Sequence, residues 1–217
     1  IADDAINSEH YTDGSIDTAH IAADQIVASL IADNAINSEH YTDGSIDTAH
    51  IADANVTAAK MFSGFANGIT EADQFRLTAD LTSQGDITSN LERNDGTAFS
   101  KIGTGMTESS GVFTFASTGI YKVSATIRAY SSANDVVSIE IKVTTNNSDF
   151  SVVADAAAGD QSNSKSQTGT VSSFVDVTDT SNVKVKFRAG SLSSGTVIEG
   201  NSSYNKTVFE FIRLGDT

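Results

Sequence analysis

The stretch T-G-I-Y-K-V-S-A-T-I-R-A at residues 118–129 decides the fold of most of this chain. Its apolar residues occupy every second position and polar residues lie between them: Tyr121, Val123, Ala125, Ile127 and Ala129 alternate with Lys122, Ser124, Thr126 and Arg128. Side chains of a β-strand point alternately to the two faces of a sheet. This period of two therefore predicts a strand with one buried face.

The same period recurs on both sides of this stretch. It is clear at 75–81, 137–143 and 183–189, and further strands are expected at 111–116, 150–157, 168–177 and 206–214. Clusters of Ser, Asn, Asp and Gly separate the runs at the spacing of an antiparallel all-β domain. Eight or more strands favour a sandwich of the jelly-roll type.

Three segments of this region carry a resemblance to a known family: G-V-F-T-F at 111–115, T-G-I-Y-K-V-S-A at 118–125 and T-V-F-E-F-I-R-L at 207–214. They resemble the globular head of complement component 1q and of the tumour necrosis factor superfamily. The preceding L-E-R-N-D-G-T-A-F-S-K segment, which begins at residue 91, is similar to such heads on cyanophage structural and tail-fibre proteins. The likeness extends over about residues 70–215.

This resemblance implies a homotrimer in which residues of the first and last strands pack around the threefold axis. Phe209 and Phe211 lie on one face of the last expected strand, and Val208 and Ile212 lie on the other, as in a strand buried on both sides. The collagen stalk of that family is absent, because the chain has no Gly-X-Y repeat and no proline.

Residues 1–60 follow another period. Residues 1–23 recur at 31–53 with two changes, and within this 30-residue block a ten-residue unit has apolar residues at its first and sixth positions. A period of five suits neither a continuous helix nor a continuous strand, so each decad must bend. We expect the bend at Asp13-Gly14 and its equivalents, and a helical turn capped by residues such as Asp17.

One such chain cannot surround its own apolar residues, so the rows of isoleucine need partner chains. Three parallel copies around an axis would bury them, and the residues assigned to the axis are Ile6, Ile16, Ile26, Ile36 and Ile46. The decads, written D-G-S-I-x-T-A-x-I-A-D, resemble repeats of homotrimeric phage tail-fibre shafts. A disordered acidic linker and a pentapeptide-repeat solenoid are the alternatives for this region.

Four histidines share the tenth position of their decads: His10, His20, His40 and His50. If that position faced a threefold axis, rings of imidazoles could hold a transition metal or respond to pH. The same position is occupied by Leu30 and Lys60, so packing or surface histidines are the simpler interpretation.

Composition supports a division into a shaft at 1–60, a linker at 61–70 and a head at 71–217. All eleven Phe residues lie after Met61, and residues 1–60 hold eleven Asp or Glu and one Lys. A net charge of −15 argues against nucleic-acid binding and anionic membranes. No apolar run is long enough to span a membrane, so we expect no membrane insertion. Residue 1 falls inside a repeat, so we expect more chain upstream, through which other virion tail proteins would attach.

Strand parity places the loops at 131–135, 159–167 and 191–205 together at one tip. Their amide, hydroxyl and charged groups suit a polar or glycan surface. The candidate binding residues there are Asn134, Asp135, Asp160, Gln161, Asn163, Lys165, Glu199, Asn201 and Tyr204. Three of their carboxylates are weak candidates for Ca²⁺, since nothing matches a calcium-loop motif.

Catalysis is not expected, and neither is a bound cofactor. The region 61–217 contains no His and no Cys, which excludes triads built on those residues there. The leading hypothesis is a virion tail-fibre protein whose trimeric head binds a host-surface glycan or protein. The alternatives are a subunit of a bacterial or spore-surface adhesive filament at the cell surface, and a capsid or tail decoration protein that binds no receptor.

Overall fold

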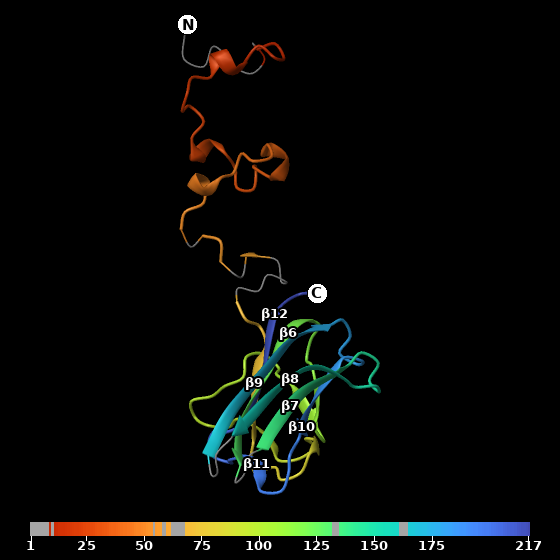
Figure 1. Cartoon of the computed structure of the whole chain (residues 1–217). Coiled ribbons are helices and arrows are strands. Elements are labelled where there is room, and N and C mark those ends of the chain that lie inside the picture. Colours follow the sequence, from red (N-terminus) through yellow and green to blue (C-terminus); the bar gives the residue numbers. More distant parts are fainter. Residues whose placement is uncertain are drawn as a thin grey trace. The chain divides into compact units, whose positions relative to one another are not determined.

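The structure is a computed structural model that describes residues 9, 11–53, 55–57, 60–61, 68–131, 135–160 and 165–217, with the backbone alone of residue 160. The chain divides into two compact units, Ile1–Phe65 and Ala66–Thr217, here named the repeat unit and the head (Figure 1). Most of the expected linker at 61–70 lies outside the described residues. Within the described parts, no helix is long and apolar enough to cross a membrane.

The repeat unit repeats one local structure every ten residues. A turn at the third and fourth positions is followed by a short 3-10 helix at the eighth to tenth. These helices are η2 (Thr18–His20), η3 (Ala28–Leu30), η4 (Ser38–His40) and η5 (Thr48–His50). The fourth position has a positive φ in each complete described decad, at Gly14, Asp24, Asn34 and Gly44. Gly, Asn and Asp are the residues that adopt this conformation most readily, so the expected bend is confirmed.

Side-chain caps hold three of these helices. The Oδ1 atom of Asp17 accepts a hydrogen bond from the backbone N–H of Ala19 at 2.9 Å, and the Nδ1 atom of His20 lies 2.7 Å from the same oxygen. Asp47 and Asn37 make the equivalent contacts in their decads. The cap that the sequence predicts is therefore present, with a histidine ring completing it. Val27 gives η3 no side-chain cap.

The apolar residues of the repeat unit are not covered by their own chain. The exposed fraction is 50% for Ile16, 60% for Ile26, 46% for Ile36 and 47% for Ile46. Ile6 lies outside the described residues. No described residue from 9 to 60 is buried, so the described part of this unit has backbone turns without a hydrophobic core.

The head is a sandwich of two antiparallel sheets, which confirms the predicted all-β fold. Sheet A contains β1 (Ala72–Leu77), β3 (Leu91–Arg93), β6 (Gly119–Ser131), β9 (Lys165–Val177), β11 (Thr196–Ile198) and β12 (Val208–Gly215). Sheet B contains β2 (Gly85–Asp86), β4 (Thr107–Ser109), β5 (Val112–Thr114), β7 (Asp135–Thr144), β8 (Ser151–Asp160) and β10 (Lys184–Gly190). Successive strands pass repeatedly from one sheet to the other, as in a jelly roll (Figure 1).

Aromatic rings from both sheets fill the space between them. Phe187 of sheet B lies 4.5 Å from Phe209 of sheet A between ring centroids, and Phe113 lies 4.9 Å from Phe211. These four rings are at most 1% exposed. The alternating residues of 118–129 behave as predicted, because the apolar residues pack into this core while Lys122 and Arg128 are exposed.

Strand pairing gives the head two distinct ends. Strands β6 and β9 pair along their whole length, from Gly119 with Val177 to Ser131 with Lys165. The chain enters β1 beside the last residues of β12, at the end of the sandwich where β6 begins with Gly119. We call this end the proximal end and the opposite end the distal end. The connections β6–β7, β8–β9 and β10–β11 leave from the distal end, as strand parity predicts.

Candidate functional site

The predicted binding residues that the structure describes fall into two groups. Two lie at the distal end, whereas the β11–β12 connection begins beside Arg128 of β6 and reaches Gln74, in the middle of β1, through Asn205. Asp135 begins β7, Lys165 begins β9, and Glu199, Asn201 and Tyr204 belong to the connection between β11 and β12. The predicted residues Asn134, Gln161 and Asn163 lie outside the described residues, and Asp160 is described only as the backbone partner of Asp135.

Asp135 ties two connections together. Its Oδ2 atom accepts hydrogen bonds from the hydroxyls of Ser193 and Thr196, at 2.5 and 2.7 Å. These hydrogen bonds lower the pKa of Asp135 below its ordinary value, because they stabilise the ionised form. A shallow cleft beside this carboxylate is also lined by Lys165 and Gln167.

Glu199 forms a second anchor, where the β11–β12 connection begins. Its carboxylate accepts bonds from Lys206 Nζ at 2.8 Å and from the Ser166 hydroxyl at 2.9 Å, and it lies 2.8 Å from Arg128 Nε. Burial alone would raise the pKa of Glu199, but these donors and the Arg128 charge lower it. The carboxylate therefore holds β6, β9 and the β11–β12 connection in one arrangement.

Tyr204 is presented by a turn that Asn201 holds. The Oδ1 atom of Asn201 accepts hydrogen bonds from the backbone N–H groups of Ser203 and Tyr204, at 2.8 and 3.0 Å. The Tyr204 side chain is 56% exposed. An aromatic ring with a hydroxyl, held on an ordered turn, offers apolar area at low cost in side-chain entropy, as binding surfaces often do.

The carboxylates of Asp135 and Glu199 are occupied by protein donors. Both oxygens of Glu199 and both oxygens of Asp135 bind donors of the head itself. In the parts of the chain that the structure describes, no group of three or more His, Cys, Asp or Glu side chains is arranged to hold a metal ion. The described histidines, His20, His40 and His50, direct Nδ1 to their own helix caps, and His10 lies outside the described residues.

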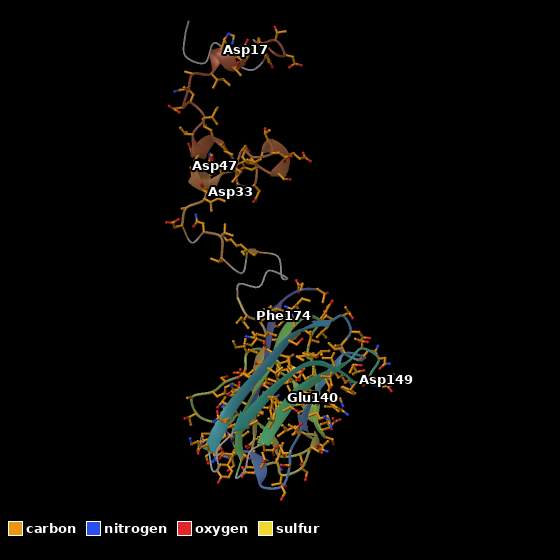
Figure 2. All side chains as sticks on the ribbon, in the orientation of Figure 1. Asp17, Asp33, Asp47, Glu140, Asp149 and Phe174 are labelled. Carbon is orange, nitrogen blue, oxygen red and sulfur yellow. The ribbon has the colours of Figure 1, made fainter. Side chains whose placement is uncertain are left out.

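The outer face of sheet A carries an aromatic residue that the sequence analysis missed. Phe174 of β9 is 70% exposed and is labelled in Figure 2. It lies at one of the alternate positions of β9 that face solvent, and Ser172 and Asp176 are on the same face. The sequence does show that Phe174 falls among the polar alternate positions of its strand, and this could have identified it. Val208 and Ile212 of β12 share this outer face and are partly buried rather than fully buried.

A groove of about 520 Å³ opens between β3 and β4, the edge strands at one side of the two sheets. We name it the β3–β4 groove. No pattern in the sequence indicated this groove. Its lining residues are Phe75, Leu91, Glu92, Arg93, Lys101, Thr104, Met106, Thr107 and Glu108.

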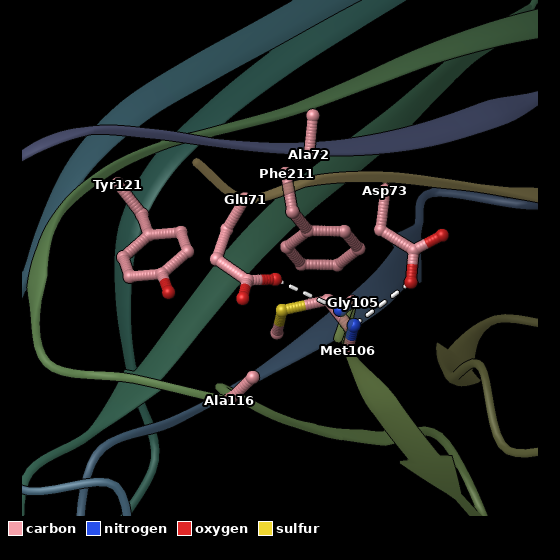
Figure 3. A pocket seen from close by; sticks show the side chains of 8 residues that line it. All are labelled: Glu71, Ala72, Asp73, Gly105, Met106, Ala116, Tyr121 and Phe211. Atoms are coloured by element: carbon pink, nitrogen blue, oxygen red, sulfur yellow. Dashed lines mark hydrogen bonds between the residues drawn. The ribbon is translucent and has the colours of Figure 1, made fainter. Parts of the chain in front are cut away.

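One wall of this groove is the segment 101–106, which two carboxylates of the β1 region hold in place. Glu71 accepts hydrogen bonds from the backbone N–H groups of Thr104 and Gly105, and Asp73 accepts one from Met106 at 2.8 Å (Figure 3). The Gly105 backbone has a φ of +75°, and a Cβ atom there would lie 2.5 Å from Asp73 Oδ2. This segment therefore approaches β1 as closely as glycine permits.

Comparison with known proteins supports the fold of the head. No protein-family model matches the chain, and no curated protein matches it. The head is similar to the solved structure of Eiger TNF from S. frugiperda, with a TM-score of 0.53 and 16% identity, over 69% of this chain and 96% of that one. Two murine APRIL structures, at pH 5.0 and pH 8.5, match with TM-scores of 0.45, at 12% and 11% identity, over 66% of this chain and 98% of theirs. The head thus has the TNF-like jelly-roll fold that the sequence predicts.

Proposed function

We propose that this chain is the subunit of a homotrimeric virion tail fibre, in which the repeat unit forms a shaft and the head binds a host-surface receptor, either a glycan or a protein. This role is one of binding and assembly, without catalysis. The proposal is supported by the order of the two sequence resemblances, a phage-like shaft followed by a TNF-like head.

The exposed isoleucines of the repeat unit are the main observation that supports a trimer. The turns and helices of the described decads are closed by hydrogen bonds between residues three positions apart, yet Ile26 is 60% exposed and its equivalents are about half exposed. Burying a fully exposed isoleucine contributes about 1.5–3 kcal/mol, so covering a half-exposed one contributes about half as much, and the row recurs in each described decad. Identical chains with the same five-residue spacing provide a matching apolar row at every level.

The head offers a surface for the same association. Phe174 on the outer face of sheet A and Val152 and Val153 on β8 are each about half exposed or more. Strands β8 and β9 are the edge strands on one side of the two sheets. A threefold arrangement that places this edge against the outer face of a neighbouring sheet A would cover both surfaces.

Acidic residues oppose this assembly and make it depend on salt. Residues 1–60 carry eleven acidic residues and one Lys, so three parallel copies bring like charges together. Salt screens such repulsion. We therefore expect the trimer to be more stable at 0.5 M NaCl than at low ionic strength.

Molar mass in solution is the first test, measured by light scattering on the full chain. A mass of three chains is expected, and a monomer at micromolar concentration would contradict the proposal. Ile26→Asp should weaken assembly of the shaft, while Gln25→Asp, which introduces the same charge at the adjacent exposed position, should not.

Receptor binding is tested separately, by competition of the purified protein with virion adsorption to host cells. Tyr204→Ser should reduce competition, while Ser181→Ala, at the proximal end, should leave it unchanged. Trimers that fail to bind cells or to compete would overturn the receptor role and leave the assembly intact. That result would favour a decoration protein.

A further inference from the structure

The β3–β4 groove has the dimensions of a small-ligand site. Its volume of about 520 Å³ falls in the range typical of pockets for small molecules. Phe75 and Met106 at its base are buried, at 4% and 3% exposure, and Leu91 is partly buried. The groove thus combines an apolar base with open access from solvent.

Two cations line this groove, and each keeps donors available. Lys101 Nζ donates to the backbone carbonyl of Thr104 and forms no ion pair with any described carboxylate. Arg93 pairs with Asp73 through Nε and Nη2, and Nη2 also donates to the Met106 carbonyl. No described acceptor contacts Arg93 Nη1, and the guanidinium lies 4.9 Å from the ring centroid of Phe75.

The two acidic residues of the lining are engaged elsewhere. The Glu92 carboxylate binds Arg76 at 2.8 Å, and strand alternation directs Glu92 to the face of β3 opposite to that of Leu91 and Arg93. Glu108 accepts a hydrogen bond from the Gly111 N–H at 2.7 Å. Glu92 Oε2 and Glu108 Oε1 are thus bound to protein donors, and the cationic donors that the groove offers a ligand are Lys101 Nζ and Arg93 Nη1.

The wall that begins at Lys101 is ordered before any ligand arrives. Glu71 and Asp73 hold the backbone from Thr104 to Met106, and Figure 3 shows the hydrogen bonds to Gly105 and Met106. Because the site is already ordered, binding a ligand loses little conformational entropy.

We propose that the β3–β4 groove binds a single carboxylated sugar residue of the uronic acid type. The carboxylate accepts from Lys101 Nζ and Arg93 Nη1, and the apolar ring face lies over Leu91 and Met106. Thr104 and Thr107 supply hydroxyl groups within the same groove for the sugar hydroxyls. A single carboxylate matches the two cationic donors that the groove presents, Lys101 Nζ and Arg93 Nη1.

This site is independent of the proposed receptor role. It lies at the side of the sandwich, whereas the distal connections lie at the end, and none of the predicted binding residues lines it. Binding in the groove also does not require a trimer, so failure of either proposal leaves the other open to its own test.

The test compares methyl glucuronide with methyl glucoside, two sugars that differ only in the carboxylate, by ligand-observed NMR on the full chain. Methyl glucuronide is expected to bind with a Kd of about 1 mM, and the glucoside at least about tenfold more weakly. When the protein protons are saturated, the saturation should transfer most strongly to the protons on the apolar face of the sugar ring, because that face contacts the base of the groove.

Variants decide whether binding occurs in this groove. Lys101→Met should weaken methyl glucuronide about tenfold. Lys184→Met, which removes a cation of β10, should have no effect. Equal binding of the two sugars, no effect of Lys101→Met, or no binding at about 20 mM ligand, some twenty times the expected Kd, would each overturn the proposal. Thermal unfolding of both variants confirms that they fold.

Discussion

Asp73 and Arg93 form an ion pair of which only Asp73 is buried, so replacing one member should have a very different effect from replacing the other. The Asp73 side chain is 1% exposed and that of Arg93 is 37% exposed. Arg93→Met leaves a carboxylate buried without its counter-charge, although it keeps hydrogen bonds from the backbone N–H groups of Gln74 and Met106. Asp73→Asn leaves a cation that water can reach.

The expected magnitudes follow from this asymmetry. Stranding a buried charge costs about 3–5 kcal/mol, and we expect about 3 kcal/mol for Arg93→Met because two donors remain. Asp73→Asn loses charge-assisted hydrogen bonds, and solvent screening around Arg93 limits its cost to about 1.5 kcal/mol. The double variant should cost about 2 kcal/mol, so the two single costs are far from additive.

Guanidinium-induced unfolding of the full chain measures these costs. All variants must be compared at one protein concentration, because association contributes to the free energy of unfolding. Lys184→Met is the control and should lie within about 0.5 kcal/mol of the parent chain. The reasoning is refuted if Asp73→Asn costs more than Arg93→Met, or if the double variant equals the two single costs added together.

Three further outcomes are expected. Gly105→Ala should lower stability by about 1–3 kcal/mol in chemical unfolding, because alanine is strained at positive φ and its Cβ meets Asp73. Asp135 and Glu199 have lowered pKa values, so the stability that their ionised forms contribute is complete above the ordinary carboxyl pKa and is lost as the pH falls through the lowered values. Amide hydrogen exchange at 191–207 should therefore be faster at pH 3 than at pH 6, after correction for the pH dependence of the intrinsic exchange rate. Phe187→Ala removes a ring that is 1% exposed and should cost about 3–5 kcal/mol in thermal or chemical unfolding, whereas an unchanged midpoint would contradict the described core.

Local patterns allowed much of this fold to be predicted from the sequence. The alternation at 118–129 specifies which side chains of β6 enter the core, and the Asp13-Gly14 dipeptide specifies a bend because few residues adopt positive φ. Both features depend on residues close together in the chain. The grouping of distal connections was equally accessible, because it needs only the order and number of strands.

The β3–β4 groove could not be found in this way. It depends on Glu71 and Asp73 binding backbone groups more than thirty positions away, at Thr104 to Met106, and no sequence period reports such contacts. The sequence shows that the histidines share one position of the decad, but it did not indicate that His20, His40 and His50 contact the caps of their own helices. A histidine three residues after a capping Asp is an unusual variant of a motif normally completed by Glu or Gln.

The self-contained decad has a consequence for how this protein can change its reach. Each turn, cap and short helix is closed by hydrogen bonds within about ten residues, so no decad needs a particular neighbour in order to fold. Copying or deleting whole cassettes would alter length while leaving every remaining cassette intact, and the near-identical blocks 1–23 and 31–53 are what such copying leaves behind. The distance spanned by the N-terminal unit can therefore be adjusted by recombination alone, without any compensating substitution elsewhere in the chain.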